Sequence, residues 1–430
     1  MKEIFILKMK TFIKKNSIPF MFSLLMSIYA MSSPLKSGDA LQFKKDIESF
    51  DYHYLSFAVF RYKNWSSRFL IESITAYFSV HDIQFLLLIF CLSFLFMYAI
   101  IQLIGFDDIR YHQYKIVIVI LALFFFPINM LFESAGIIAT MTNYYVPMCL
   151  MAYVLLIFKQ VAKTYILQLL AFLFTIQQEQ FALLGLIIFS VAIGYQIYHK
   201  LSAVKYIPFF VISIGGILSA KLSPGNAIRN AVETRVRFPE FQSISLLRKL
   251  DMGFIKMSYD LLFNGLVSLF FILMLISILI LSIVRKKYHQ SIGLSTIILI
   301  IVLPYLQLWT PASKIKIIYD TFPKDAKGNL LSATGQSIVT TFPDLTMLIL
   351  FIGIMLMTWT VLTTYRDRII VFTLLIGGVA TKMLLSLSPT IYISGIRTFI
   401  PMIFAAFLIT IYFIKLMLDQ IIPHQEQIER

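Results

Sequence analysis

The fold of this protein is decided by stretches such as YDLLFNGLVSLFFILMLISILILSIVRKK, residues 259–287. Only Asp260 is charged within residues 259–284, and the next three residues are all basic. An apolar run of about 18 residues or more can cross the hydrocarbon core of a bilayer as a helix. Basic residues accumulate at the cytoplasmic ends of such helices. The stretch therefore predicts a transmembrane helix that ends in the cytoplasm.

The composition extends this prediction to the whole chain. The 430 residues are 59% hydrophobic and only 14% charged, with a mean hydropathy of +0.83. A soluble protein of this size could not bury so much apolar surface. The alternation typical of outer-membrane strands is absent from the sequence. We therefore expect an all-α polytopic membrane protein.

Hydropathy predicts about twelve spans. They lie near residues 17–33, 84–105, 115–133, 145–158, 165–176, 181–198, 204–220, 259–284, 291–309, 345–364, 369–388 and 400–418.

This count places both termini in the cytoplasm, and five lysines before the first span agree with it. We expect one integral membrane domain, residues 1–430, with long outer loops at about 34–82, 221–258 and 310–344. Residues 66–78 have apolar side chains at helical spacing and predict an interfacial helix. The expected location is the cytoplasmic (inner) membrane, with the functional site facing outside.

Several classes of site are missing from the sequence. The two cysteines lie in apolar runs, and the six histidines show no metal-ligand spacing. We find no phosphate-binding Walker sequence and no serine-hydrolase or zinc-peptidase motif. We therefore expect no metal or other cofactor, and no nucleic-acid partner. The net charge of +15 suits anionic lipid headgroups or a phosphate-bearing substrate.

The first outer loop contains the best candidate for a catalytic acid or base. Asp39 lies among small residues in SGDA, where a substrate could approach closely. The carboxylates of Asp46, Glu48 and Asp51 are reserve candidates. A solvated loop is the alternative interpretation for all four.

Further polar groups flank the apolar runs. Trp65 and Arg68 in NWSSRF could stack on a sugar and hold an anion, or could simply anchor the loop at the interface. Glu179 in QQEQ lies between two apolar runs, where a polar group is often functional. Asn143 and Tyr144 in TNYYVP suit a sugar-binding wall, and a tyrosine belt is the ordinary alternative.

Basic residues near the expected outer face could bind a lipid phosphate. Pro224 and Gly225 in SPGNAIRN predict a tight turn, with Asn226 before a helix start. The candidate phosphate-binding residues are Arg229, Arg235, Arg237, Lys382 and Arg397. Contact with ordinary lipid headgroups is the alternative, and Lys382 could reach the interface by snorkelling.

Taken together, these motifs resemble the polytopic bacterial glycosyltransferases of the GT-C superfamily, especially the O-antigen and teichoic-acid glucosyltransferases. The resemblance rests on an early loop carboxylate, W-x-x-R (65–68), N-Y-x-x-P (143–147), the E-Q turn at Glu179 and PGNAIR (224–229). Many relatives have two adjacent acids where this chain has Asp39 followed by Ala40, which leaves the second acid unassigned.

The resemblance implies a GT-C fold and an inverting sugar transfer on the outer face. The implied donor is a polyprenyl-phosphate sugar, and the acceptor is an extracytoplasmic polysaccharide, lipopolysaccharide or teichoic acid. Asp39 would be the general base, and the contacts to the sugar or the phosphate would carry over to Trp65, Arg68, Glu179 and Arg229. Together with Trp65, Arg68 and Glu179, we expect Asn143, Tyr144 and Asn226 to bind substrate. Membrane lipids, a donor-making glycosyltransferase and a flippase are the further partners implied.

Two alternatives remain open. An O-antigen or capsule polysaccharide polymerase would also use many spans and basic outer loops. A flippase or transporter of lipid-linked sugars would instead place charged or broken helices at mid-membrane in two related halves. The sequence shows no such repeat, which favours an enzyme.

Overall fold

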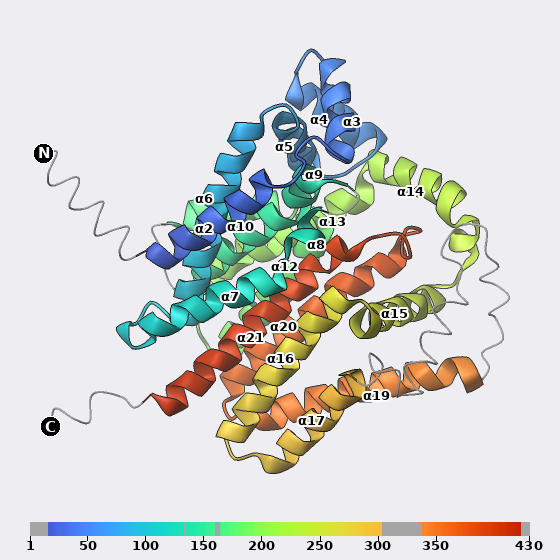
Figure 1. Cartoon of the computed structure of the whole chain (residues 1–430). Helices are drawn as coiled ribbons and strands as arrows, with labels where there is room; N and C mark the ends of the chain where they lie inside the picture. Colours follow the sequence, from blue (N-terminus) through green and yellow to red (C-terminus); the bar gives the residue numbers. More distant parts are fainter. Residues whose placement is uncertain (1–15, 133–134, 160–163, 303–337, 423–430) are drawn as a thin grey trace, which may run out of the picture. The chain divides into compact units, whose positions relative to one another are not determined.

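The computed structural model describes residues 16–132, 135–159, 164–302 and 338–422 (Figure 1). Within these ranges every regular element is a helix, and no strand occurs. The predicted all-α class is therefore confirmed. Seven helices of the described part are long and apolar enough to cross a membrane. They are Asp82–Ile104, Ile137–Lys159, Glu179–Tyr198, Val204–Leu222, Gly265–Val284, Tyr365–Leu387 and Ile396–Ile421.

The other expected spans correspond to shorter apolar helices, or to helices that break. α2 (Ser17–Met31) and α17 (Tyr288–Val302) are 15 residues each in the described part. The expected span at 115–133 consists of α7 (Lys115–Phe125) and α8 (Ile128–Phe132). Phe126 leaves the helical conformation, with φ −123° and ψ 62°, because the ring of the following Pro127 disfavours it there.

One expected outer segment is wrong. Residues 142–147 do not form a loop, since the helix Ile137–Lys159 runs through them as α9 (Ile137–Thr140), η2 (Met141–Tyr145), α10 (Val146–Val154) and η3 (Leu155–Lys159). The segment η2 is a π-helical turn, in which the Val146 N–H donates to the Met141 carbonyl. Pro147 has no N–H for the Asn143 carbonyl, so a wider turn at this position costs little.

The chain forms two compact units, 1–227 and 228–430. In the first unit, α2 packs along α6 (Asp82–Ile104), which also contacts α10. α11 (Tyr165–Thr175) packs on α10, and α12 (Glu179–Tyr198) packs on α13 (Ile207–Leu222).

Three short helices occupy the loop between α2 and α6. They are α3 (Asp39–Glu48), α4 (Tyr54–Asn64) and α5 (Phe69–Phe78). Phe43, Ile47, Phe57 and Ala76 form their common core, with each side chain at most 9% exposed. The predicted helix at 66–78 therefore exists as α5, but its buried face contacts α3, α4 and η2.

In the second unit, α21 (Ile400–Ile421) packs against α16 (Gly265–Val284) and α20 (Tyr365–Met383). The expected span 259–284 is shorter than predicted, because α15 (Leu246–Phe263) ends before Asn264 and α16 begins after it. Asp260 thus belongs to α15, where Lys256 Nζ lies 2.6 and 2.7 Å from its carboxylate oxygens. This pairing explains how a buried carboxylate is tolerated.

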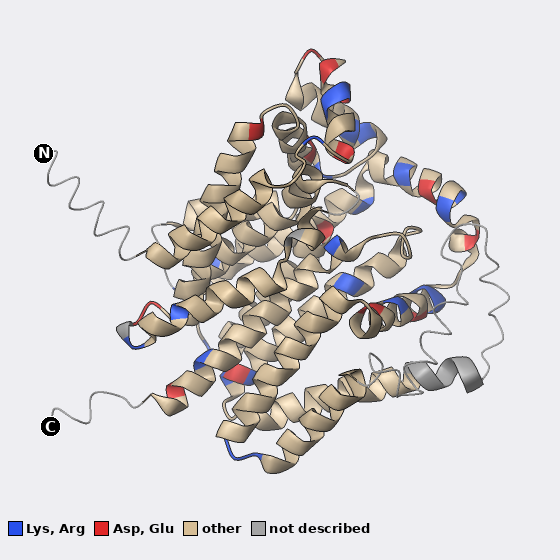
Figure 2. Cartoon of the chain, viewed as in Figure 1, with Lys and Arg blue, Asp and Glu red and all other residues tan. Residues whose placement is uncertain are grey.

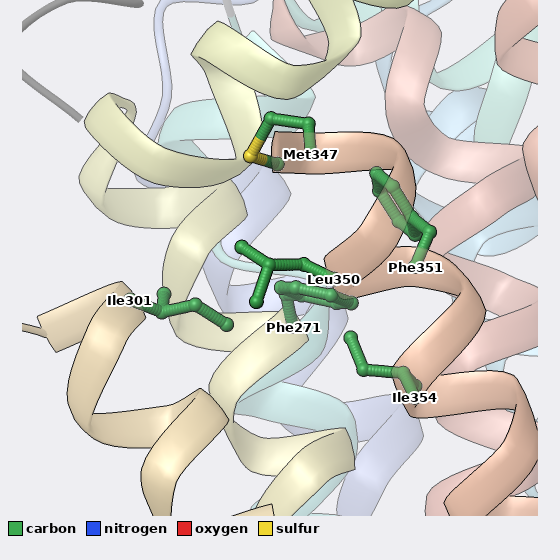
Figure 3. A pocket seen from close by; sticks show the side chains of 6 residues that line it. All are labelled: Phe271, Ile301, Met347, Leu350, Phe351 and Ile354. Carbon is green, nitrogen blue, oxygen red and sulfur yellow. The ribbon is translucent and has the colours of Figure 1, made fainter. Parts of the chain in front are cut away.

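Charged residues are unevenly distributed along the helices. Figure 2 shows them concentrated on α3, α4, α14 (Pro224–Arg237) and α15, while the long helices carry few. An apolar cavity of about 10 Å³ lies where α16, α17 and α19 (Ile338–Val361) meet, lined by Phe271, Ile301, Met347, Leu350, Phe351 and Ile354 (Figure 3). Most of the expected third outer loop, 310–344, lies outside the described residues, and its last seven residues are helical in α19.

Candidate functional site

Arg68 is the centre of a hydrogen-bonded cluster in the first unit. It lies at the N-terminal boundary of α5, in the link that follows α4. Its Nε and Nη2 donate to Glu179 Oε2 at 3.1 and 2.7 Å, and its Nη1 donates to Asn143 Oδ1 at 2.8 Å. Both charged side chains are largely buried, with Arg68 15% and Glu179 21% exposed. The structure thus brings three of the predicted residues together.

The π-helical turn η2 places Asn143 in this cluster. The Asn143 Nδ2 donates to the Ala139 carbonyl at 2.8 Å, which leaves Oδ1 to accept from Arg68. The neighbouring side chains bond to other helices: Thr142 to Thr75 of α5, and Tyr145 to Ser93 of α6, both at 2.7 Å. These contacts fix the orientation of the whole turn.

Glu179 is the first residue of α12, directly after the turn that ends α11. The side chain of Gln178 caps this helix by accepting from the Gln180 N–H at 2.7 Å. A carboxylate at a helix N-terminus interacts favourably with the helix dipole. The expected break between residues 176 and 181 is therefore confirmed, and it aims Glu179 at Arg68.

The SPGN segment, 223–226, packs against the link between α4 and α5. A Cβ on Gly225 would lie 2.6 Å from the Trp65 nitrogen and 2.6 Å from the Tyr62 oxygen. Only glycine allows the two backbones to approach this closely. Asn226 then accepts from the Ser67 N–H at 3.2 Å and donates to the Ser67 hydroxyl at 2.9 Å.

The electrostatics of the cluster keep Arg68 charged. Burial, the largest single cause, disfavours the charged guanidinium, but the charge and hydrogen bond of Glu179, together with Tyr144 and Glu72, raise the pKa of Arg68 above its ordinary value. In the described part of the chain, three of the five guanidinium N–H groups of Arg68 donate to Glu179 and Asn143. The remaining N–H groups could bind a phosphate or a sugar hydroxyl.

A second ion pair lies beside the first, and sequence reasoning missed it. Arg61 Nε donates to Glu72 Oε2 at 2.8 Å, and Glu72 is only 6% exposed. The guanidinium carbon of Arg61 lies 5.2 Å from the Phe43 ring centroid and 6.0 Å from that of Trp65. Trp65 is half-buried. The sequence held no signal for this pair, because the i, i+4 spacing favours pairing of Glu72 with Arg68 instead.

Asp39 lies at the start of α3 and is exposed. Its N–H donates to the Ala135 carbonyl at 2.9 Å, just before the helix that carries Asn143. Gly38 and Gly136 have φ of 58° and 77°, and a Cβ on either would lie 2.4 Å from the backbone of the other segment. This glycine pair therefore ties the Asp39 backbone to the beginning of that helix.

The three reserve candidates for the general base are Asp46, Glu48 and Asp51, and they lie within α3 or near its end. Asp46 accepts from Gln42 Nε2 at 2.6 Å within α3, and Glu48 and Asp51 are exposed near its end. No bond in the described part joins these three carboxylates to the Arg68 cluster. Among the described residues, no group of three or more His, Cys, Asp or Glu side chains could hold a metal ion.

The predicted phosphate-binding residues belong to the second unit. Arg235 and Arg237 are exposed on α14 and Arg229 is half-buried, with Arg237 Nε 3.6 Å from Glu233. Lys382 is 4% exposed, donates to Thr398 Oγ1 at 3.1 Å and lies 3.6 Å from the Phe399 ring centroid. Arg397 is half-buried in the adjoining η10 (Ile396–Phe399). Lys382 thus lies beside the SGIRT segment that contains Arg397.

No protein-family model, curated protein or solved structure matches this chain. The geometry of the cluster must therefore carry the functional argument by itself.

Proposed function

We propose that this protein is a membrane glycosyltransferase of the GT-C type. It would transfer a sugar from a polyprenyl-phosphate donor to an extracytoplasmic polysaccharide, lipopolysaccharide or teichoic acid. One observation carries the proposal: W-x-x-R, the asparagine of N-Y-x-x-P, the E-Q turn and PGN, far apart in sequence, meet in one hydrogen-bonded cluster around Arg68. Polar and charged residues between membrane helices are often functional.

Each group has a role that its environment suits. The remaining N–H donors of Arg68 would hold the phosphate or a hydroxyl of the donor, and Trp65 would stack on the sugar. Asp39, which is exposed, would take the proton of the acceptor hydroxyl as general base. The Asp39 N–H donates to the carbonyl of Ala135, which lies eight residues before Asn143 in the chain and just before the helix that carries it.

The reaction would proceed as a single displacement. The acceptor oxygen bonds to the anomeric carbon while the bond from that carbon to the phosphate oxygen breaks, so the configuration inverts. The acceptor proton passes to Asp39, and the polyprenyl phosphate leaves with the bonding electrons. Positive charge near the leaving phosphate would lower the barrier.

The second unit, taken alone, has a feature that suits a lipid-linked donor. An apolar cavity of about 340 Å³ lies among α15, α16, α19, α20 and α21. Phe399 lines this cavity, and the ammonium of Lys382 lies against the Phe399 ring. A hydrocarbon chain with an anionic headgroup matches an apolar cavity beside a cation.

The proposal is tested with purified protein in lipid nanodiscs and in sealed vesicles, supplied with a polyprenyl-phosphate hexose and a glycan acceptor. We expect hexose to appear on the acceptor and polyprenyl phosphate to be released. Movement of the intact lipid across vesicles without cleavage would overturn the proposal in favour of a transporter. Glycan analysis of a strain lacking the protein would then identify the sugar and the acceptor.

A further inference from the structure

Ser67, which sequence analysis did not single out, links two of the converging segments. Its N–H donates to Asn226 Oδ1, and its hydroxyl accepts from Asn226 Nδ2 at 2.9 Å. The same hydroxyl donates to Glu179 Oε1 at 3.1 Å. Ser67 is 5% exposed, so water competes little for these bonds. We call Ser67 and Asn226, with the bonds between them, the Ser67–Asn226 clamp.

The chemistry of the groups gives this chain of bonds one direction. The Asn226 Nδ2 can only donate, and it also donates to the Ala220 carbonyl at 2.9 Å. The Ser67 hydroxyl must therefore accept from Asn226, and its single hydrogen remains for Glu179, which as a carboxylate only accepts. Glu179 then receives one bond on Oε1 and two on Oε2, the latter both from Arg68.

The backbone around the clamp is held firmly. Gly225 lies against the Trp65 and Ser66 nitrogens, and Ser223 Oγ donates to the Tyr62 carbonyl at 3.3 Å. Arg68 follows Ser67 directly in the chain. A shift of the clamp would therefore move the guanidinium and its carboxylate partner together.

We propose that Ser67 and Asn226 are positioning residues for Arg68, and that they orient Glu179 rather than contact the substrate themselves. The sequence assigned Asn226 to substrate binding. The positioning role replaces that assignment, because both hydrogens of the Asn226 side-chain amide already donate to protein atoms. The inference rests on the proposed glycosyl transfer, in which Arg68 holds the donor. Its consequence is that loss of the clamp lowers turnover more than it weakens donor binding.

Four variants separate positioning from simple structural support. Ser67→Ala and Asn226→Ala remove one side each, and both should lower kcat about 100-fold with the donor KM changed by about twofold or less. Ser67→Thr keeps the hydroxyl and should retain near wild-type turnover. Asn226→Asp keeps the acceptor for the Ser67 N–H but makes the Ser67 hydroxyl donate away from Glu179. It should therefore lose turnover like Asn226→Ala.

Hydrogen exchange of peptides covering residues 65–70 provides a readout that is independent of activity. Asn226→Ala should speed exchange there, while Asn226→Asp should keep the protection. Asn64→Ala and Ser49→Ala make the same substitutions in the same loop, at exposed residues whose side chains donate to the carbonyls of Phe60 and Asp46, and should change neither readout.

The outcomes distinguish the two proposals. If wild type transfers sugar and Asn226→Asp or Ser67→Ala transfers as fast as wild type, the positioning role is overturned while the transferase remains. If wild type transfers no sugar, the transferase proposal fails, and the positioning role fails with it. The clamp has its own test: unchanged hydrogen exchange in Asn226→Ala would disprove it whatever the activity. If the losses of turnover in Ser67→Ala and Asn226→Ala add up in the double variant, the two residues act independently. That result would also overturn the clamp.

Discussion

Arg68 and Glu179 are 111 positions apart in the chain, yet two nitrogens of the Arg68 guanidinium bond to a single carboxylate oxygen of Glu179. The ion pair joins the start of α5 to the start of α12. It is largely buried, and each partner satisfies the other's charge. Most functional expectations for this protein can be tested at or around this pair.

Removing the charge of Glu179 should destabilise the protein. Glu179→Gln leaves the Arg68 guanidinium without its counter-charge in a largely buried site, and should cost about 1–3 kcal/mol of folding free energy. Thermal unfolding in detergent measures the loss. Glu48→Gln makes the same change on the exposed surface of α3 and should cost less than about 0.5 kcal/mol. Equal effects of the two variants would contradict a structural role for the ion pair.

Asp39→Asn should abolish most sugar transfer without affecting stability. An exposed carboxylate that acts as general base contributes about 10²–10⁴-fold in rate, and its amide cannot accept the proton. Transfer rate and unfolding temperature are measured on the same preparation. Asp46→Asn and Asp51→Asn serve as controls, and a larger loss in either would move the base to that residue.

Gly225→Ala should destabilise the contact between SPGN and the segment that links α4 to α5. The added methyl group would lie 2.6 Å from backbone atoms of Trp65 and Tyr62, and the shift needed should cost about 1–3 kcal/mol. Gly215→Ala on the neighbouring helix α13 is the matched control, since nothing lies within 4 Å of its added Cβ. That control should raise stability by up to about 1 kcal/mol, because alanine favours the helix. A harmless Gly225→Ala would show that the two backbones can separate at little cost.

Lys382→Met should weaken binding of polyprenyl phosphate. Loss of a charge-assisted contact with the phosphate should reduce affinity about tenfold or more. The folded state should stay as stable or gain stability, because an ammonium group that is 4% exposed is replaced by an apolar side chain of similar length. Binding is measured by titration in nanodiscs.

Lys221→Met, at an exposed position at the end of α13, controls for the general loss of one positive charge. If Lys382→Met binds polyprenyl phosphate as tightly as wild type, the cation beside the cavity does not recognise the headgroup.

Helix type and most helix positions follow from the sequence, but not helix lengths. The uncharged run after Asn264 became α16, and the break at QQEQ became the start of α12. The twelve expected spans became seven long helices and several shorter ones in the described part, because hydropathy does not register breaks such as the one before Pro127. It also missed that TNYYVP continues a helix, since its polar and aromatic residues find partners on α5 and α6.

For the candidate site, the sequence indicated which residue types belong together but not how they bond. Arg68, Asn143, Glu179 and Asn226 were all expected, and the structure places them in one cluster. Ser67 carried no signal of its own, because a serine in a polar loop is ordinary until its neighbours are known. The function of the cluster stays a prediction that the variants above can test.

By itself, the sequence indicated the surroundings of the helices: long runs of apolar residues predict membrane spans, because the free energy of burial depends on composition. Only the tertiary structure decided that Arg68 pairs with Glu179 while Arg61 pairs with Glu72. Spacing alone favours pairing of Arg68 with Glu72, four residues further along the chain. The choice depends on distances of a few ångströms, set by a π-helical turn at Asn143 and a glycine contact at Gly225. Hydrogen bonds are short-ranged and directional, so a pattern of residue types cannot specify them.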